Sequence, residues 1–139
     1  MTDDGAREIA ALCGPLDVGV DGIERLTNNT AELKAVIEAL RFARNDPAAK
    51  GRPVLLRYDS AYAALISCGV WKAKANKALA KVAQDEWALT RRKTGGRLWL
   101  SHVKGHSGHR WNHRADRLAD AGRHGETQPP GLAPGIVVD

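Results

Sequence analysis

Three carboxylate side chains, Glu32, Asp59 and Asp116, occupy positions from which they could meet in the folded chain. Asp59 ends an apolar run and precedes a helical pattern, and α/β sheets bind ligands beyond the carboxyl ends of their strands. Glu32 falls at the edge of the buried stripe of an amphipathic helix. Asp116 shares a face of the last helix with Asn112, four residues earlier. Carboxylate oxygens suit Mg²⁺, and two such ions can activate water for phosphodiester cleavage, so the pattern predicts this chemistry.

Each of these acids also has a structural interpretation. Glu32 stands three residues after Asn29, which is a good helix N-cap, as the acid of a capping box does. Asp59 can itself cap the helix that follows it. The third acid can be balanced at the surface by Arg114 or Arg117. Residue types alone leave both interpretations open.

A cluster of histidines follows the last apolar run. Its members, separated by four, three and four positions, are His102, His106, His109 and His113. Structural zinc sites usually recruit cysteine, and Cys13 and Cys68 are both distant in sequence, which argues against zinc. A histidine within the Gly-rich loop 104–109 could instead shuttle a proton or order a water molecule beside a metal site.

Positive charge gathers in residues 72–97, which hold eight Lys or Arg residues and only two acids. Trp71 and Trp87 are interleaved with this basic stretch. Basic and aromatic side chains together suit a polyanion, because each neutralised phosphate releases counterions. A solvated helix face is the alternative interpretation.

The chain has 139 residues, of which 43% are hydrophobic and 27% charged, and a formal net charge of +5. These values predict one globular domain and exclude wholesale disorder. No apolar run reaches the roughly 20 residues of a membrane-spanning helix, and the acidic N-terminus does not resemble a signal peptide. Two isolated cysteines without a CxxC spacing favour an intracellular, reducing compartment over a disulfide scaffold.

The apolar periodicity predicts helices alternating with strands. We expect helices over 29–44, 60–69, 74–93 and 112–121, strands over 53–59 and 97–103, and two front strands over 8–16 and 23–27 joined by a turn. This order predicts an α/β fold with a mixed sheet flanked by helices. Residues 123–139, with three prolines, are predicted to be a tail outside the core.

Four short motifs stand in order along the chain. They are residues 27–33 (TNNTAEL), 58–60 (YDS), 102–109 (HVKGHSGH), and Asn112 followed by 115–119 (ADRLA). Together they resemble a type 1 ribonuclease H domain, recognisable over residues 23–121. The resemblance implies a five-stranded mixed sheet flanked by helices, and a domain over residues 1–122 followed by the tail.

By this resemblance, Glu32, Asp59 and Asp116 correspond to three of the family's four metal-binding acids. His106 corresponds to a mobile-loop histidine that helps product release or water deprotonation. The corresponding substrate-binding residues are Asn28 and Asn29 for the RNA strand, Trp71, Lys72 and Lys74 for a DNA-strand phosphate, and Asn112. The family is an endonuclease that cuts the RNA strand of RNA–DNA hybrids with two Mg²⁺ or Mn²⁺ ions, leaving 5′-phosphate and 3′-hydroxyl ends.

Two positions depart from the family pattern. Ala61 stands where relatives often carry a polar substrate contact, which predicts weaker affinity. Asp4 resembles the family's first acid, but only three residues precede it, fewer than the five or six of a typical strand. We therefore expect an N-terminal truncation that removes the first strand, with residues 4–16 left from the second. Replacement of the missing acid by Asp4 is the alternative.

Three functions compete at this point. The first is a monomeric nuclease that acts on RNA–DNA hybrids and has no membrane partner. The second is a catalytically inactive module that keeps the basic stretch and binds nucleic acid. The third is a His-rich metal-binding domain without nuclease chemistry. Cleavage of a hybrid, salt-sensitive binding without cleavage, and retained zinc would distinguish them.

Overall fold

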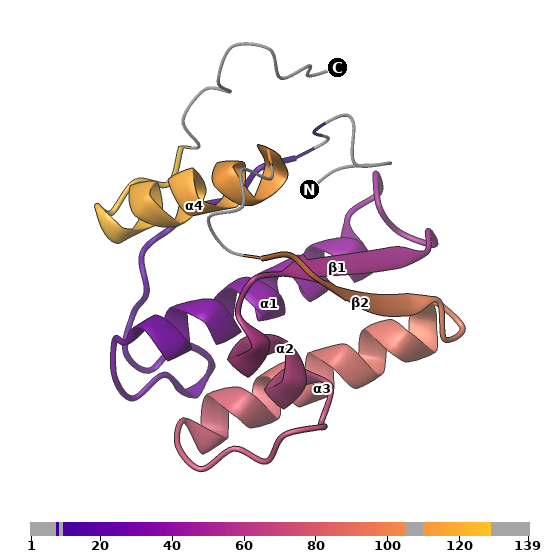
Figure 1. Cartoon of the computed structure of the whole chain (residues 1–139), viewed down its shortest axis with the longest axis horizontal. Coiled ribbons are helices and arrows are strands. Elements are labelled where there is room, and N and C mark those ends of the chain that lie inside the picture. The colour runs from indigo at the N-terminus through magenta and orange to yellow at the C-terminus, as the bar shows by residue number, and fades with distance from the viewer. Residues whose placement is uncertain (1–7, 9, 105–109, 129–139) are drawn as a thin grey trace. The chain divides into compact units, whose positions relative to one another are not determined.

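The computed structural model describes residues 8, 10–104 and 110–128. Its elements (Figure 1) are η1 (Val20–Gly22), α1 (Asn28–Asn45), β1 (Val54–Tyr58), α2 (Ala61–Ser67), α3 (Lys77–Lys93), β2 (Leu98–His102) and α4 (Arg110–Arg123). The chain divides into two compact units, residues 17–102 and residues 1–16 with 103–139. Among the helices of the described residues, none is long and apolar enough to cross a membrane.

Helix α1 begins at a reciprocal threonine cap. Thr27 has an extended backbone, and its hydroxyl accepts a hydrogen bond from the Thr30 N–H at 3.2 Å. The Thr30 hydroxyl accepts one from the Thr27 N–H at 2.8 Å. The predicted box of Asn29 and Glu32 is therefore wrong, because Thr27 and Thr30 fill both of its positions. Such caps contribute about 1 kcal/mol to helix stability.

The apolar stripe of α1 forms the centre of the unit of residues 17–102. Leu33, Val36, Ile37 and Leu40 are buried, as their spacing predicts. The helix packs against α3, where Leu79 is fully buried, and against α2. Each fully buried aliphatic side chain of this size contributes roughly 1.5–3 kcal/mol through the hydrophobic effect.

Strands β1 and β2 pair in parallel, with Val54 opposite Leu98 and Tyr58 opposite His102. A parallel pair needs a long crossover connection, which α2 and α3 supply here. The burial of β1 alternates, with Leu55 and Arg57 more exposed than their neighbours. The two predicted strands and the α/β class are confirmed in these elements.

The two front strands are a wrong prediction for the described residues. Residues 10–17 and 23–27 have no regular structure, and Glu8 makes a β-bridge. Gly14 and Pro15 interrupt the first segment. In the second, Ile23 is buried but residues 24–27 are all exposed, so the segment lacks the alternation of a strand.

A charged network ties η1 to α1. Asp21 has a left-handed backbone, with φ 54° and ψ 20°, and its half-buried carboxylate meets two cations. Lys34 Nζ lies 2.5 Å from Asp21 Oδ2, and the Arg41 guanidinium donates to both carboxylate oxygens at 2.9 and 3.0 Å. Arg41 also donates to Glu86 on α3 at 3.3 Å. The network therefore links three elements of one unit.

The second unit contains α4 and the segment that follows Glu8. Glu8 and Arg114 are both buried, and the guanidinium donates to the carboxylate at 3.0 and 3.3 Å. A Cβ atom on Gly122 would lie 2.4 Å from the Gly14 carbonyl oxygen. The chain segments thus approach so closely that only glycine fits at position 122.

Candidate active site

Glu32 lies in the second turn of α1 and is half-buried, next to the fully buried Leu33. This matches the predicted position at the edge of the apolar stripe. Since Thr27 and Thr30 make the capping box, Glu32 is not required for it. The capping-box interpretation of this acid is therefore wrong.

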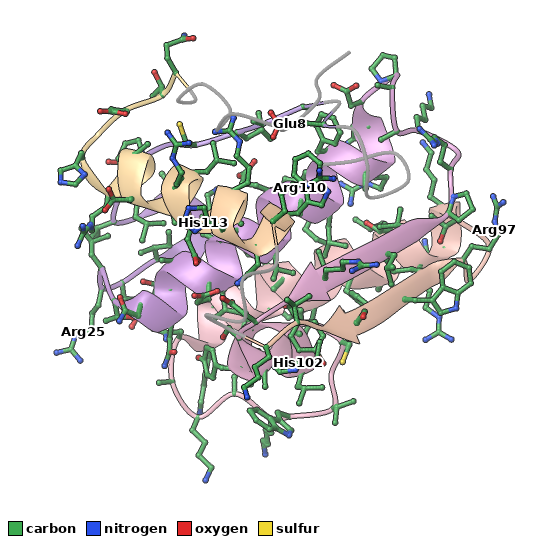
Figure 2. The ribbon with its side chains drawn as sticks, turned by 45° about the horizontal axis from the view of Figure 1, so that its top comes forward. Glu8, Arg25, Arg97, His102, Arg110 and His113 are labelled. Atoms are coloured by element: carbon green, nitrogen blue, oxygen red, sulfur yellow. The ribbon has the colours of Figure 1, made fainter. Side chains whose placement is uncertain are left out.

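Asp59 follows β1 directly and is half-buried, at the carboxyl end of the strand as predicted. The N-cap of α2 is Ser60, so Asp59 does not cap that helix. The preceding Tyr58 packs edge-on against His102, the last residue of β2 (Figure 2), with 5.4 Å between ring centroids. This ring contact fixes the ends of both strands beside Asp59. Because α2 packs against α1, the elements carrying Glu32 and Asp59 are neighbours in one unit.

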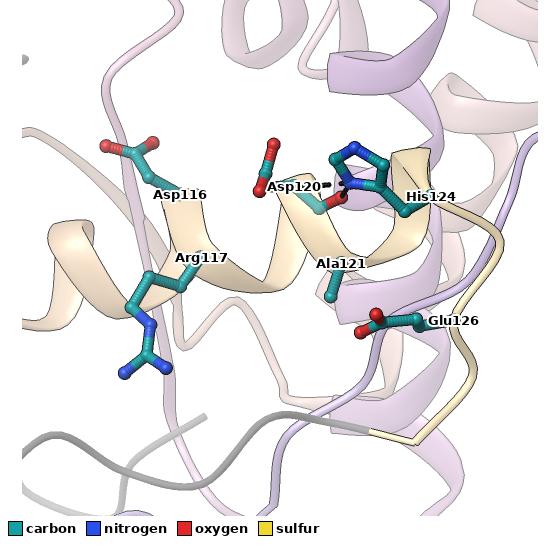
Figure 3. Close-up of a pocket in the computed structure, with 6 residues that line it drawn as sticks. All are labelled: Asp116, Arg117, Asp120, Ala121, His124 and Glu126. Atoms are coloured by element: carbon teal, nitrogen blue, oxygen red, sulfur yellow. Dashed lines mark hydrogen bonds and ion pairs between the residues drawn. The ribbon is translucent and has the colours of Figure 1, made fainter.

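Asp116 is exposed on α4, in the other unit. It lines an open depression of about 320 Å³ (Figure 3), together with Arg117, Asp120, Ala121, His124 and Glu126. The Arg117 side chain runs away from the Asp116 carboxylate (Figure 3). Arg114 is occupied by Glu8. Neither arginine that was expected to balance Asp116 is therefore placed to do so.

The three acids are divided between the two units, Glu32 and Asp59 in one and Asp116 in the other. Across the described part of the chain, no three His, Cys, Asp or Glu side chains gather closely enough to hold a metal ion. The meeting of all three carboxylates stays a prediction. Their chemistry suits a hard cation, because each offers oxygen donors.

Asn28 and Asn29 are the first two residues of α1, and both side chains are exposed. The first N–H groups of a helix lack intrahelical partners and favour anions. Two exposed amides at such a position can contact a phosphodiester strand. Their geometry is compatible with the role that the resemblance implies.

Trp71, Lys72 and Lys74 lie on the connection between α2 and α3, and all three side chains are exposed. The Trp71 N–H donates to the Leu65 carbonyl at 3.0 Å, which anchors this connection to α2. Asn76, with a left-handed φ of 53°, ends it at the start of α3. An exposed indole with two ammonium groups on an anchored loop can hold a phosphate.

The remaining predicted residues divide between described and undescribed parts. Asn112 is half-buried near the start of α4, where His113 is exposed. Asp4, His106 and His109 lie outside the described residues. The proposed roles of these three residues stay predictions.

Two charged clusters were not predicted from the sequence. One is the Glu8–Arg114 pair, whose partners are too distant in sequence to give a local signal. The other is the network around Asp21, where the hydrogen bond from Arg41 lowers the carboxyl pKa to about 2 despite the opposing effect of burial. Its local signs in the sequence were the i,i+4 spacing of Lys34 and Glu38 and the i,i+3 spacing of Glu38 and Arg41.

Comparison with known proteins identifies the family of this chain. The family model for RNase H matches residues 4–124. A ribonuclease H of Janthinobacterium sp. (strain Marseille) is 36% identical over 130 residues, which cover 85% of this chain and 78% of the relative. A ribonuclease H of Herminiimonas arsenicoxydans is 38% identical over 108 residues, covering 69% and 67%. No solved structure gives a significant match. The chain therefore belongs to the ribonuclease H family.

Proposed function

We propose that this protein is a type 1 ribonuclease H, an endonuclease that hydrolyses the RNA strand of RNA–DNA hybrids with Mg²⁺ or Mn²⁺. The relatives are named ribonuclease H, which supports this class of activity. The observation that carries the proposal is that Asp59 directly follows β1, at the carboxyl end of the parallel pair and in the same unit as Glu32. Thr27 and Thr30 form the cap of α1, Ser60 rather than Asp59 stands at the N-cap position of α2, and Arg114 pairs with Glu8.

The carboxylates Glu32, Asp59 and Asp116 would hold the divalent ions. When bound, such ions supply an activated water and charge stabilisation at the leaving oxygen. Asn28 and Asn29 would orient the RNA strand, and Trp71, Lys72 and Lys74 would bind a phosphate of the DNA strand. His106 would accept a proton or assist product release, and Asn112 would contact substrate. The RNA 2′-hydroxyl distinguishes the scissile strand from DNA.

The test is cleavage of an end-labelled RNA–DNA hybrid with Mg²⁺ or Mn²⁺. Asp59→Asn should lower the rate at least about 100-fold, because it removes a source of transition-state charge stabilisation. Asp85→Asn is the matched control, since Asp85 is an exposed acid paired with Lys81 on α3. Binding of Mn²⁺, followed by calorimetry, should weaken in Asp59→Asn alone. Equal rates in both variants would refute the assignment.

The family's fourth acid gives a further test of the same site. If Asp4 is not a metal ligand, Asp4→Asn should cleave at the parental rate. A loss as severe as that of Asp59→Asn would assign the fourth carboxylate to Asp4 instead. The comparison needs only the cleavage assay described above.

A hybrid-binding module without catalysis is the second candidate. It is favoured by the basic stretch of residues 72–97, which suits a polyanion whether or not the protein cleaves it. Salt-sensitive hybrid binding without cleavage in either metal would support it. In that case Asp59→Asn should bind the hybrid as the parent does.

We also propose that the protein acts as a monomer in an intracellular, reducing compartment. Cys13 and Cys68 are both free and half-buried, which supports the reducing compartment. Sedimentation of the chain with and without reductant should give one monomeric species. A dimer that reductant dissociates would contradict the proposal.

A further inference from the structure

The outer face of the two-stranded sheet exposes two large apolar side chains. Leu55 on β1 and Trp99 on β2 are direct neighbours in the parallel register, and they are 50% and 52% exposed. Successive side chains of a strand alternate between faces, so Arg57 and Ser101 follow them on the same face. These four residues, the Trp99 face, combine an exposed indole with an aliphatic support.

The charges within the two strands of this face are positive, and the acid Asp59 follows β1 at its carboxyl end. Arg57 is exposed, and Leu55, Trp99 and Ser101 carry no charge. Arg97 lies immediately before β2 (Figure 2). It is two residues before Trp99, so the alternation of side chains puts it on the same side of the sheet. Its guanidinium donates to the Thr94 carbonyl at 2.9 Å and to the Gly51 carbonyl at 3.3 Å. These contacts hold one cation in place at the beginning of the strand.

We propose that the Trp99 face binds single-stranded nucleic acid, with one base stacked on Trp99 and phosphates beside Arg57 and Arg97. An aromatic platform with adjacent cations is the usual way in which proteins bind single strands without sequence preference. Leu55 supports the stacked base from the neighbouring strand. The face is separate from Trp71, Lys72 and Lys74, which lie on the connection between α2 and α3.

The direction of the strands relates the Trp99 face to the proposed function, on which this step rests. Arg97 precedes β2, Trp99 is its second residue, and Asp59 directly follows the paired strand β1. A single strand lying along the face would therefore run toward the strand end that carries Asp59. A hybrid with a single-stranded overhang would gain affinity that a blunt hybrid lacks.

The test uses the full chain and fluorescein-labelled 12-mers of uridine and of thymidine, followed by anisotropy. Trp99→Leu should weaken binding about fivefold or more, the loss expected for one stacked base. Trp99→Phe keeps an aromatic ring, so its loss of 12-mer affinity, on a logarithmic scale, should be less than half of that in Trp99→Leu. Leu89→Ala is the control, because Leu89 is an exposed apolar residue on α3. The ratio of the RNA and DNA affinities identifies the preferred strand.

Two outcomes would overturn the inference. Equal binding by the parent and by Trp99→Leu would show that Trp99 does not contact nucleic acid. A dimer in sedimentation that Trp99→Leu disrupts, without binding of either 12-mer, would assign the face to a second copy of the chain. Folding of each variant is checked by circular dichroism, and the Phe and Leu variants both keep an apolar side chain on the exposed site.

The proposal is distinguishable from the proposed catalytic function. Asp59→Asn should abolish hybrid cleavage and leave 12-mer binding unchanged. Trp99→Leu should preserve cleavage of a blunt hybrid and remove the preference for an overhang. Loss of both activities in both variants would contradict a separate surface.

Discussion

At the scale of single residues, the start of α1 separates a structural from a chemical role. Thr27 and Thr30 satisfy each other's backbone N–H groups, and Glu32 stands only two residues further on. Asparagine, threonine and aspartate are all good caps, so composition does not decide which residue begins the helix. The hydrogen bonds decide it, and Glu32, in the second turn of the helix, takes no part in the cap.

This division predicts opposite effects for two substitutions. Thr27→Ala should lower the free energy of unfolding by about 1 kcal/mol, because a cap hydrogen bond is lost. Glu32→Gln should change it by less than half as much and should lower hybrid cleavage instead. Urea denaturation and the cleavage assay measure the two effects. Similar destabilisation by both substitutions would show that Glu32 has a structural role after all.

At the scale of elements, η1 is held to α1 by charge. The Asp21 carboxyl has a pKa of about 2, below its ordinary value near 3.8, because Arg41 and Lys34 donate to it. Its contribution to stability is therefore complete above pH 4 and is lost as the pH falls toward 2. The sign follows because the unfolded chain binds the proton more readily than the folded one.

The corresponding prediction concerns Asp21→Asn. The parent should lose about 2 kcal/mol more of its unfolding free energy than the variant between pH 4 and pH 2. Urea denaturation across this range measures the difference. Asp85→Asn, which removes an exposed i,i+4 partner of Lys81, should retain the parental pH dependence. Identical pH profiles for the parent and Asp21→Asn would contradict the stabilising network.

The second unit depends on a close approach between α4 and the N-terminal segment that contains Gly14. A methyl group on Gly122 would lie 2.4 Å from the Gly14 carbonyl oxygen, whereas one on Gly14 would meet nothing within 4 Å. Gly122→Ala should therefore destabilise the protein by roughly 1–3 kcal/mol, the usual cost of overpacking. Gly14→Ala should have little effect, and thermal unfolding compares the two. Equal melting temperatures would show that the segment moves away without cost.

At the scale of the whole molecule, the net charge of +5 bears on association with polyanions. If Lys72 and Lys74 each contact a phosphate, substitution of either by Gln should reduce the slope of log affinity against log salt by about 1. Lys93→Gln, at the far end of α3, should leave the slope unchanged. Hybrid binding between 50 and 200 mM salt measures it. Equal salt slopes in all variants would indicate that the phosphate contacts are distributed over the entire basic stretch of residues 72–97.

The sequence predicted the parts of this molecule that depend on local periodicity. The spacing of Leu33 and Leu40 predicted α1, because a helix that is buried on one side has a regular apolar pattern. The apolar run that includes Leu56 predicted β1. The pattern failed before residue 28, where Gly14, Pro15 and Gly22 break any alternation. It also failed for the Glu8–Arg114 pair, since contacts between distant residues leave no periodic trace.

The parallel pairing of β1 with β2 also constrains the order of folding. Val54 meets Leu98 only after the intervening chain has been closed into a loop, at an entropic cost of about 3 kcal/mol or more. Helices α2 and α3 shorten that loop when they form and pack on α1, so strand pairing should be a late kinetic step. Until it occurs, both strands expose unpaired backbone edges, and the nascent chain is most prone to aggregation during this interval.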